Sequence, residues 1–311
     1  MNAPVVSTIV LGLAWFAAIN LAASALAWCA ALVAVRSSEL RRGSVLLAIR
    51  LFPAAASTVF AAALFAPAHW ILEPSETRES YGVLVWALSA LGAVILLRSG
   101  ARVLAVARAG WRLRSCRAVG DAGIYEVPGL AGVSLAGVFR TRILVGSAVR
   151  EALSADELEV AVAHECAHRA SLDNLKRSVM FCAPDVFGTA ALAREIEAKW
   201  RATAEWLADA RAVGGDQVRA MRLASALVKV SRLVSPAVSF VTSPAWSTLH
   251  DPPLLELRVR RLVGTAPAAG MPHRGVAITV GVAAVGAMLS SAVAAYPTVH
   301  GLTELLIRVL P

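Results

Sequence analysis

The chain has 311 residues, of which 58% are hydrophobic and 16% are charged, and its formal net charge is +9. Soluble globular domains have fewer apolar and more charged residues, so this composition excludes a wholly soluble protein and an intrinsically disordered one. It predicts a mainly α-helical, polytopic membrane protein.

The excess of basic residues has a simple explanation in a membrane protein. Arginines concentrate beside the predicted spans, where anionic lipid headgroups attract them. No nucleic-acid-binding motif accompanies them, so we expect membrane lipids, and no nucleic acid, as direct partners. The four cysteines form no CxxC pair, and we expect free thiols.

Four stretches with few or no charges are candidates to cross a bilayer, which takes about 20 mostly apolar residues in a helix. The second contains Arg50 and Pro53, and the third is short but could continue to Val106 along the interface. The predicted spans are Thr8 to Val35, Val45 to Leu72, Gly82 to Leu97 and Gly275 to Tyr296.

Charges between the spans predict the orientation in a cell membrane. The first loop carries Arg36, Arg41 and Arg42, and a run of arginines starts at Arg98, whereas residues 73–79 hold three acids and one base. By the positive-inside rule both termini lie outside and residues 98–274 are cytoplasmic. We therefore expect three spans in 1–106, a cytoplasmic domain in 107–274, and a fourth span with a short external tail in 275–311.

Short strands are expected at the start of the cytoplasmic domain. Residues 125–129, 132–139 and 143–145 contain apolar and β-branched residues with glycine or proline beside them. Helical patterns follow, so the domain is expected to be α+β within a mainly α chain.

The stretch His164-Glu165-Cys166-Ala167-His168 predicts a zinc site on a helix. Ser154 and Glu157 form a capping-box pattern before it. Residues four apart share one face of a helix, so His164 and His168 can bind one metal ion. Glu165 lies about 100° around the helix and can reach a water on that metal, as the HExxH pattern requires. The chemistry indicated is hydrolysis of a peptide bond.

A second helical segment supplies the rest of the predicted site. Glu205 is the candidate third ligand, because two histidines and a glutamate form a common catalytic zinc set. Asp209, one turn later, is expected to accept a hydrogen bond from His164, and Asp173 is a further candidate for such an outer position. In the alternative interpretation, Glu205 and Asp209 lie on a solvated helix face.

Three further interpretations concern residues around the motif. Cys166 is expected to be a small apolar filler, because the two imidazoles already occupy the ligand face. Asp173 or Asn174 is expected to cap the next helix. His250 is a candidate oxyanion donor, and the alternative is a loop histidine without a catalytic role.

A strand before the motif helix is a candidate for binding substrate. Extended substrates of zinc peptidases commonly pair with an exposed strand, by strand addition. The alternative is an ordinary hairpin that packs over the motif helix. The candidate substrate-binding residues are Val133, Ser134, Leu135, Ala136, Gly137, Val138 and Phe139.

The order of these features resembles a known family. A short strand at 143–145, the His-Glu-Cys-Ala-His motif, and Glu205 with Asp209 follow one another, with three spans before and one after. This order resembles the BlaR/MecR-type antirepressor membrane zinc metallopeptidases over nearly the whole chain. The resemblance implies a gluzincin-like protease domain, one zinc ion on the two histidines and Glu205, and Glu165 as general base.

The same resemblance implies a substrate and a departure from the family. Antirepressor members cleave a small DNA-binding repressor, which implies signal-regulated proteolysis of a cytoplasmic protein. Sensor members carry a large extracellular penicillin-binding domain, which has no counterpart in the tail 297–311. A signal is then expected to arrive through the spans, the short external loops or a separate sensor partner.

Two alternatives to this function remain open at the level of sequence. The HtpX and CAAX-prenyl membrane zinc peptidases share the motif, the Glu205–Asp209 pair, and His250-Asp251-Pro252-Pro253 with Arg258. That resemblance implies a quality-control or processing peptidase. The other alternative is a catalytically latent signalling scaffold, against which the complete ligand set argues.

Overall fold

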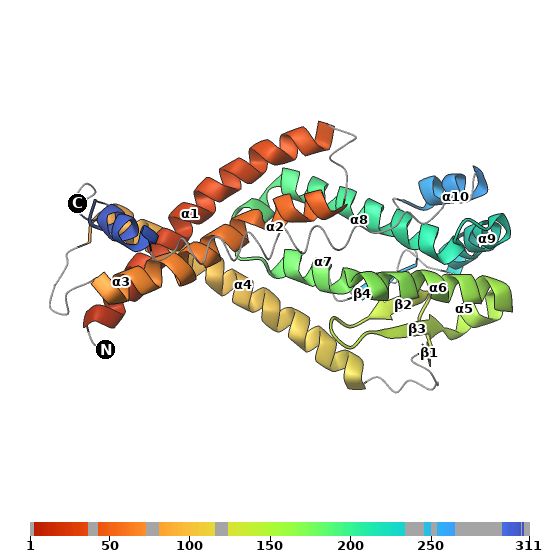
Figure 1. The fold of residues 1–311 in the computed structure, drawn as a ribbon. Coiled ribbons are helices and arrows are strands. Elements are labelled where there is room, and N and C mark those ends of the chain that lie inside the picture. Colours follow the sequence, from red (N-terminus) through yellow and green to blue (C-terminus); the bar gives the residue numbers. More distant parts are fainter. Residues whose placement is uncertain are drawn as a thin grey trace.

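The computed structural model describes residues 3–36, 43–72, 81–115, 124–233, 246–249, 254–264, 294–305 and 307. These residues form a mainly helical protein with one small sheet (Figure 1). The coarse fold class is therefore the expected one.

Three helical segments are long and apolar enough to cross a membrane, namely Val5–Arg36, Gly43–Leu72 and Val83–Trp111. They correspond to the first three predicted spans. The third is much longer than predicted, because alanines, leucines and arginines continue beyond residue 97 and no proline interrupts them. The elements are α1 (Ala3–Arg36), α2 (Gly43–Val59), the π-helical turn η1 (Phe60–Phe65), α3 (Ala66–Leu72) and α4 (Val83–Ser115).

Arg50 and Pro53 do not interrupt the second of these segments. Pro53 lies inside α2, and Arg50 is buried. The Arg50 guanidinium pairs with Asp185 at 3.0 Å and with Glu197 at 2.5 Å. Carboxylates from the chain after the motif helix thus neutralise a charge in an otherwise apolar helix.

The connection between α7 (Asp173–Cys182) and α8 (Ala191–Val213) lies against the membrane-length helices. The Asn20 amide donates to the Pro184 carbonyl at 2.9 Å, and its oxygen accepts from the Val186 amide at 3.0 Å. α8 packs on α2 and α7 on α4 (Figure 1). The helical pattern of the sequence predicts a helix over Asp185 to Val213, but the helix begins only at Ala191, after the 3-10 turn η2 (Phe187–Thr189).

The predicted fourth span, Gly275 to Tyr296, lies almost wholly outside the described residues. Residues 294–305 are helical. Val299 joins Val10 and Phe65 in one apolar cluster, and the Trp15 indole donates to the Thr303 hydroxyl at 3.0 Å. The described part of the C-terminal segment therefore packs beside the N-terminal part of α1.

The sheet has the strand order β1-β3-β2-β4. β1 runs parallel to β3, and the other neighbouring strands are antiparallel. β4 has no counterpart among the predicted strands, because it is three residues long and follows a Ser/Pro-rich segment. The strands are β1 (Ile124–Val127), β2 (Val133–Ala136), β3 (Arg142–Gly146) and β4 (Trp246–Thr248).

β2 is a central strand, so the expectation that the segment from Val133 to Phe139 pairs with substrate is wrong for its strand portion. Ser134 and Leu135 pair with β3 on one side and with β4 on the other. An incoming strand would find these edges already filled. The alternative is confirmed, because β2 and β3 form an antiparallel hairpin that contacts α6.

The motif helix α6 (Ala155–Ser171) packs between the sheet and further helices. One core joins Leu135 and Val145 of the sheet to Val160 of α6 and to Leu223 and Leu227 of α9. Burial of this apolar surface fixes α6 against the sheet. The remaining helices are α5 (Ser147–Ala152), α9 (Gln217–Leu233) and α10 (Leu255–Gly264).

Candidate metal centre

α6 begins with the predicted capping box. The Ser154 hydroxyl accepts from the Glu157 amide at 3.2 Å, and the Glu157 carboxylate accepts from the Ser154 amide at 2.8 Å. The helix then presents His164 and His168 from one face, both almost fully buried. Regular helical spacing therefore brings the two imidazoles together.

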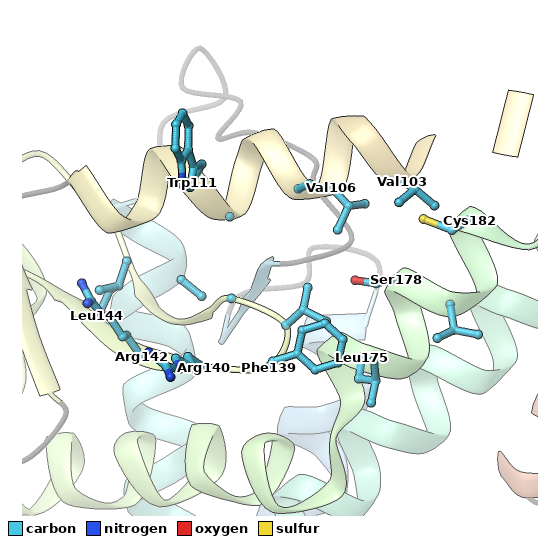
Figure 2. Close-up of a pocket in the computed structure, with 16 residues that line it drawn as sticks. Val103, Val106, Trp111, Phe139, Arg140, Arg142, Leu144, Leu175, Ser178 and Cys182 are labelled. Atoms are coloured by element: carbon cyan, nitrogen blue, oxygen red, sulfur yellow. The ribbon is translucent and has the colours of Figure 1, made fainter. Parts of the chain in front are cut away.

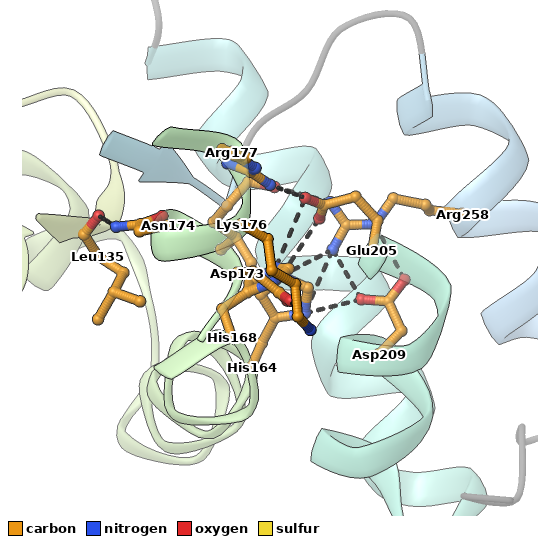
Figure 3. A network of polar contacts seen from close by, with 11 residues as sticks. Leu135, His164, His168, Asp173, Asn174, Lys176, Arg177, Glu205, Asp209 and Arg258 are labelled. Carbon is orange, nitrogen blue, oxygen red and sulfur yellow. Dashed lines mark hydrogen bonds and ion pairs between the residues drawn. The ribbon is translucent and has the colours of Figure 1, made fainter. Parts of the chain in front are cut away.

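The two imidazoles and Glu205 of α8 form a cluster that could hold a metal ion (Figure 3). The Nε2 atoms of His164 and His168 lie 3.0 Å apart. The Glu205 oxygens lie 3.4 Å from His164 Nε2 and 3.5 Å from His168 Nε2. Ligand bonds of 2.0–2.1 Å in a tetrahedral site place ligand atoms about 3.3–3.4 Å apart. The cluster therefore has dimensions that suit a small cation.

Both imidazoles are oriented through their other nitrogen. His164 Nδ1 lies 2.9 Å from Asp209 Oδ1, and His168 Nδ1 lies 2.8 Å from Asp173 Oδ2. A proton on Nδ1 donated to each carboxylate leaves the Nε2 lone pair directed into the cluster, the arrangement usual for metal-binding histidines. The two expected outer carboxylates are thus both in place, each on a different histidine. Glu205 and Asp209 are buried, so a solvated helix face is the wrong interpretation.

Arg258 of α10 closes the site on the side of α8. It is buried and donates to both oxygens of Asp209, at 2.7 Å and 2.9 Å. It also donates to the Leu249 carbonyl at 2.9 Å and pairs with Glu205 at 3.1 Å. Although burial opposes the charged form, Arg258 and the hydrogen bond from His164 hold the pKa of Asp209 below its ordinary value.

Arg177 also belongs to this network of charged side chains, and the sequence interpretation missed it. Its guanidinium lies 3.3 Å from Glu205 Oε1. Arg177 stands four residues after Asp173, so the two share one face of α7, and this spacing is the signal that could have indicated it. The sequence indicates Arg258 only through the resemblance to the HtpX and CAAX-prenyl peptidases.

Glu165 has the features expected of a group that acts on something bound in the cluster. It is completely buried, and among the described residues neither of its carboxylate oxygens has a hydrogen-bond partner. Burial raises its pKa, and the neighbouring His164 and His168 oppose that rise. An unpaired buried carboxylate is costly, so this arrangement fits a site whose metal and water would supply the partner.

The electrostatics of the cluster favour a cation. Although burial lowers the pKa of His168, the charge of Glu205 and the hydrogen bond with Asp173 raise it to about 10. Burial likewise opposes ionisation of Glu205, yet His168 and Arg258 hold its pKa well below the ordinary value. A proton therefore stands where a metal would bind, and metal binding would release it.

Other predicted residues take different places. Asn174 and Asp173 do not cap α7 with their side chains, because the helix follows directly on Leu172, which adopts a left-handed conformation with φ of 56°. Asn174 instead donates to the carbonyls of Leu135 and Gly137, at 2.9 Å each. Cys166 is half-buried against the apolar core, as expected of a filler. His250 lies outside the described residues.

Comparison of the chain with protein-family models, with characterised proteins and with solved structures finds no match.

Proposed function

We propose that the chain is an integral membrane zinc endopeptidase that cleaves a protein at the cytoplasmic face of the membrane. One observation carries the proposal: ligand atoms of His164, His168 and Glu205 converge as a set that could hold a metal ion, and the neighbouring Glu165 carboxylate is buried and has no hydrogen-bond partner among the described residues. Nitrogen and carboxylate ligands of this kind favour zinc.

In the proposed mechanism the two histidines and Glu205 hold the ion, while Asp209 and Asp173 fix the imidazoles. When bound, zinc supplies Lewis-acid polarisation of the scissile carbonyl and lowers the pKa of a coordinated water. Glu165 would act as general base and then general acid, taking a proton from the attacking water and donating it to the leaving amine nitrogen. Its buried position excludes bulk water, so the carboxylate is a stronger base there than at the surface.

The orientation of the proposed protease follows from the loop charges. We propose four spans, with Gly275 to Tyr296 as the fourth and a gluzincin-like domain before it. The arginines in the C-terminal part of α4, from Arg98 onward, favour a cytoplasmic site, with both termini outside. Residues 294–305 pack beside the N-terminal part of α1, which supports the placement of both chain ends on the same side of the membrane.

A small DNA-binding repressor is the first proposed substrate, by the resemblance to the antirepressor peptidases, and a separate sensor partner would then deliver the signal. A second candidate function is the processing or quality control of membrane proteins. A specific observation favours it, because an apolar cavity lies between the candidate span α4 and the metal centre.

The proposal is tested first by metal content. Wild-type protein is expected to purify with one zinc per chain, and His164→Ala to lose it. A wild-type stoichiometry far below one would instead favour the latent scaffold.

The substrate is tested in cells that carry wild-type protein or Glu165→Gln. Accumulation of one small repressor in the glutamine strain would support regulated proteolysis, whereas broad accumulation of membrane proteins would support processing or quality control. Identical membrane and soluble proteomes in the two strains would contradict both functions.

A further inference from the structure

A large apolar cavity lies beside the candidate metal centre. Its volume is about 750 Å³, and it is enclosed by the C-terminal part of α4, the turn between β2 and β3, and α7 (Figure 2). Val103 and Val106 of α4 face Leu175 and Val179 of α7 across it. None of these side chains takes part in the proposed chemistry.

A second, smaller cavity lies beside the first and reaches the metal centre. It has a volume of about 320 Å³, and His168 and Asp173 form part of its wall. The two cavities share Phe139, Arg140 and Leu175 among their lining residues. One extended chain could therefore contact the apolar cavity and the metal-binding histidine at the same time.

The turn between the cavities presents an uncovered aromatic ring. Phe139 is 86% exposed although it is large and apolar, and Figure 2 shows it beside Leu175 below α4. Asn174 holds this turn by its bond to the Gly137 carbonyl. On α4, Trp111 is 75% exposed on the same cavity. Phe139 and Trp111 thus add exposed aromatic surface to the apolar lining of the cavity.

We propose that the apolar cavity binds an apolar segment of a membrane-anchored protein substrate, next to the peptide bond that is cleaved. The inference rests on the proposed zinc endopeptidase and favours the second of its candidate functions, the processing or quality control of membrane proteins. α4 is both a wall of the cavity and a candidate membrane span, so a segment that reaches this wall comes from the membrane surface. Arg140, exposed between the cavities, is placed to pair with an acidic group of the substrate.

A lipid chain is a different occupant, and the observations favour it less. It would explain the apolar walls beside α4. It would not explain why these walls continue into a second cavity lined by His168 and Asp173. A peptide accounts for both cavities with one ligand.

The test uses the full-length Glu165→Gln protein in phosphatidylcholine nanodiscs, because it measures binding without turnover. The probe is a membrane-anchored synthetic peptide with a benzophenone group in its apolar half, and its twin has polar residues in that half. We expect the apolar peptide to label residues 103–111 and 175–182. Phe139→Ala, which removes an exposed ring, and Ala107→Trp, which fills the cavity, should each reduce labelling about tenfold.

Matched controls separate the cavity from general effects on the protein. Val218→Ala removes an exposed apolar side chain on α9, and Ala105→Trp adds the same bulk on α4 away from the cavity lining. Neither should change labelling. Equal labelling by the polar twin, labelling only at other places, or displacement of the peptide by added phospholipid alone would overturn the inference.

The outcome for the cavity is distinguishable from that for the proposed function. Zinc-dependent hydrolysis by wild-type protein without labelling of the cavity would overturn this inference alone. Labelling of the cavity in a protein that neither binds zinc nor hydrolyses peptides would contradict the proposed function and support the peptide site.

Discussion

Asp209→Asn and Asp173→Asn should weaken zinc binding alike but differ in their effect on the fold. Each aspartate accepts a hydrogen bond from one imidazole of the candidate metal centre, at 2.9 Å and 2.8 Å. Loss of such an outer partner typically lowers metal affinity by about 10- to 100-fold. We expect a loss in that range for both variants.

The difference lies in what else each carboxylate holds. Asp209 also pairs through both oxygens with Arg258, which is buried and cannot release its proton at ordinary pH. Breaking a buried ion pair costs about 3–5 kcal/mol. Because Glu205 and the Leu249 carbonyl still hold Arg258, we expect Asp209→Asn to lower the free energy of unfolding of the zinc-free protein by about 2–3 kcal/mol.

Asp173→Asn should destabilise the zinc-free protein much less. Its other partner, Lys176, is partly exposed, and Glu205 still pairs with His168 once the Asp173 carboxylate is gone. We expect a cost of about 1 kcal/mol. Zinc affinity would be measured by competition with a chelator, and stability by denaturant unfolding in excess chelator. Equal losses of stability in the two variants, or unchanged zinc affinity in both, would refute this reasoning.

Three further predictions concern single side chains. Glu165→Gln should raise the free energy of unfolding of the zinc-free protein at pH 7 by about 1–3 kcal/mol, because it removes a carboxyl group whose charged form burial opposes. Since burial raises the pKa of Glu165 above the ordinary 4.5, the gain should vanish when denaturation is repeated at pH values below 4.5. Burial opposes the charged form of Glu157, but hydrogen bonds from Lys229 and Ser225 lower its pKa to about 2. The stability that Glu157 contributes is therefore present above pH 4.5 and is lost as the pH falls toward 2. In an acid titration followed by circular dichroism, Glu157→Gln should lose less stability than the wild type over this range. Asn174→Ala should cost about 2 kcal/mol through two lost hydrogen bonds, and Asn174→Asp more, since a carboxylate would face two carbonyl oxygens; a thermal midpoint of Asn174→Asp equal to that of wild type would contradict this.

The central part of the site was predictable from the sequence because helical periodicity fixes it locally. His164 and His168 lie four residues apart, as do Glu205 and Asp209, and each pair falls within one regular helix. The spacing alone therefore places both members of a pair on one face. That the histidine pair of α6 meets the Glu205–Asp209 pair of α8 could be predicted only from the HExxH motif, which calls for a third ligand.

The outer part of the site was less accessible, because it depends on contacts between segments far apart in the chain. Arg258 reaches Asp209 from α10, after a stretch without clear periodicity. Asp173 reaches His168 because Leu172 adopts a left-handed conformation, which lets α7 follow α6 directly. Such a conformation is rare for leucine and leaves no signal in the sequence.

The misplaced substrate strand has a similar cause. The pattern of residues 132–139 predicts a strand correctly, but a strand is central or at an edge only through its neighbours. The neighbour β4 is three residues long and enters the sheet from about 110 residues later in the chain. The ion pairs of Arg50 with Asp185 and Glu197 are likewise long-range contacts. They explain why a predicted membrane span can contain an arginine, which its apolar sequence pattern does not.

The central claim is that Glu165 acts as a base on a water held by zinc at His164, His168 and Glu205. The most direct measurement is the rate of peptide hydrolysis by wild-type and Glu165→Gln proteins that carry the same measured zinc content. We predict hydrolysis by the wild type that chelation abolishes and zinc restores, and no hydrolysis by the fully loaded glutamine variant. Equal rates for the two zinc-loaded proteins would contradict the account.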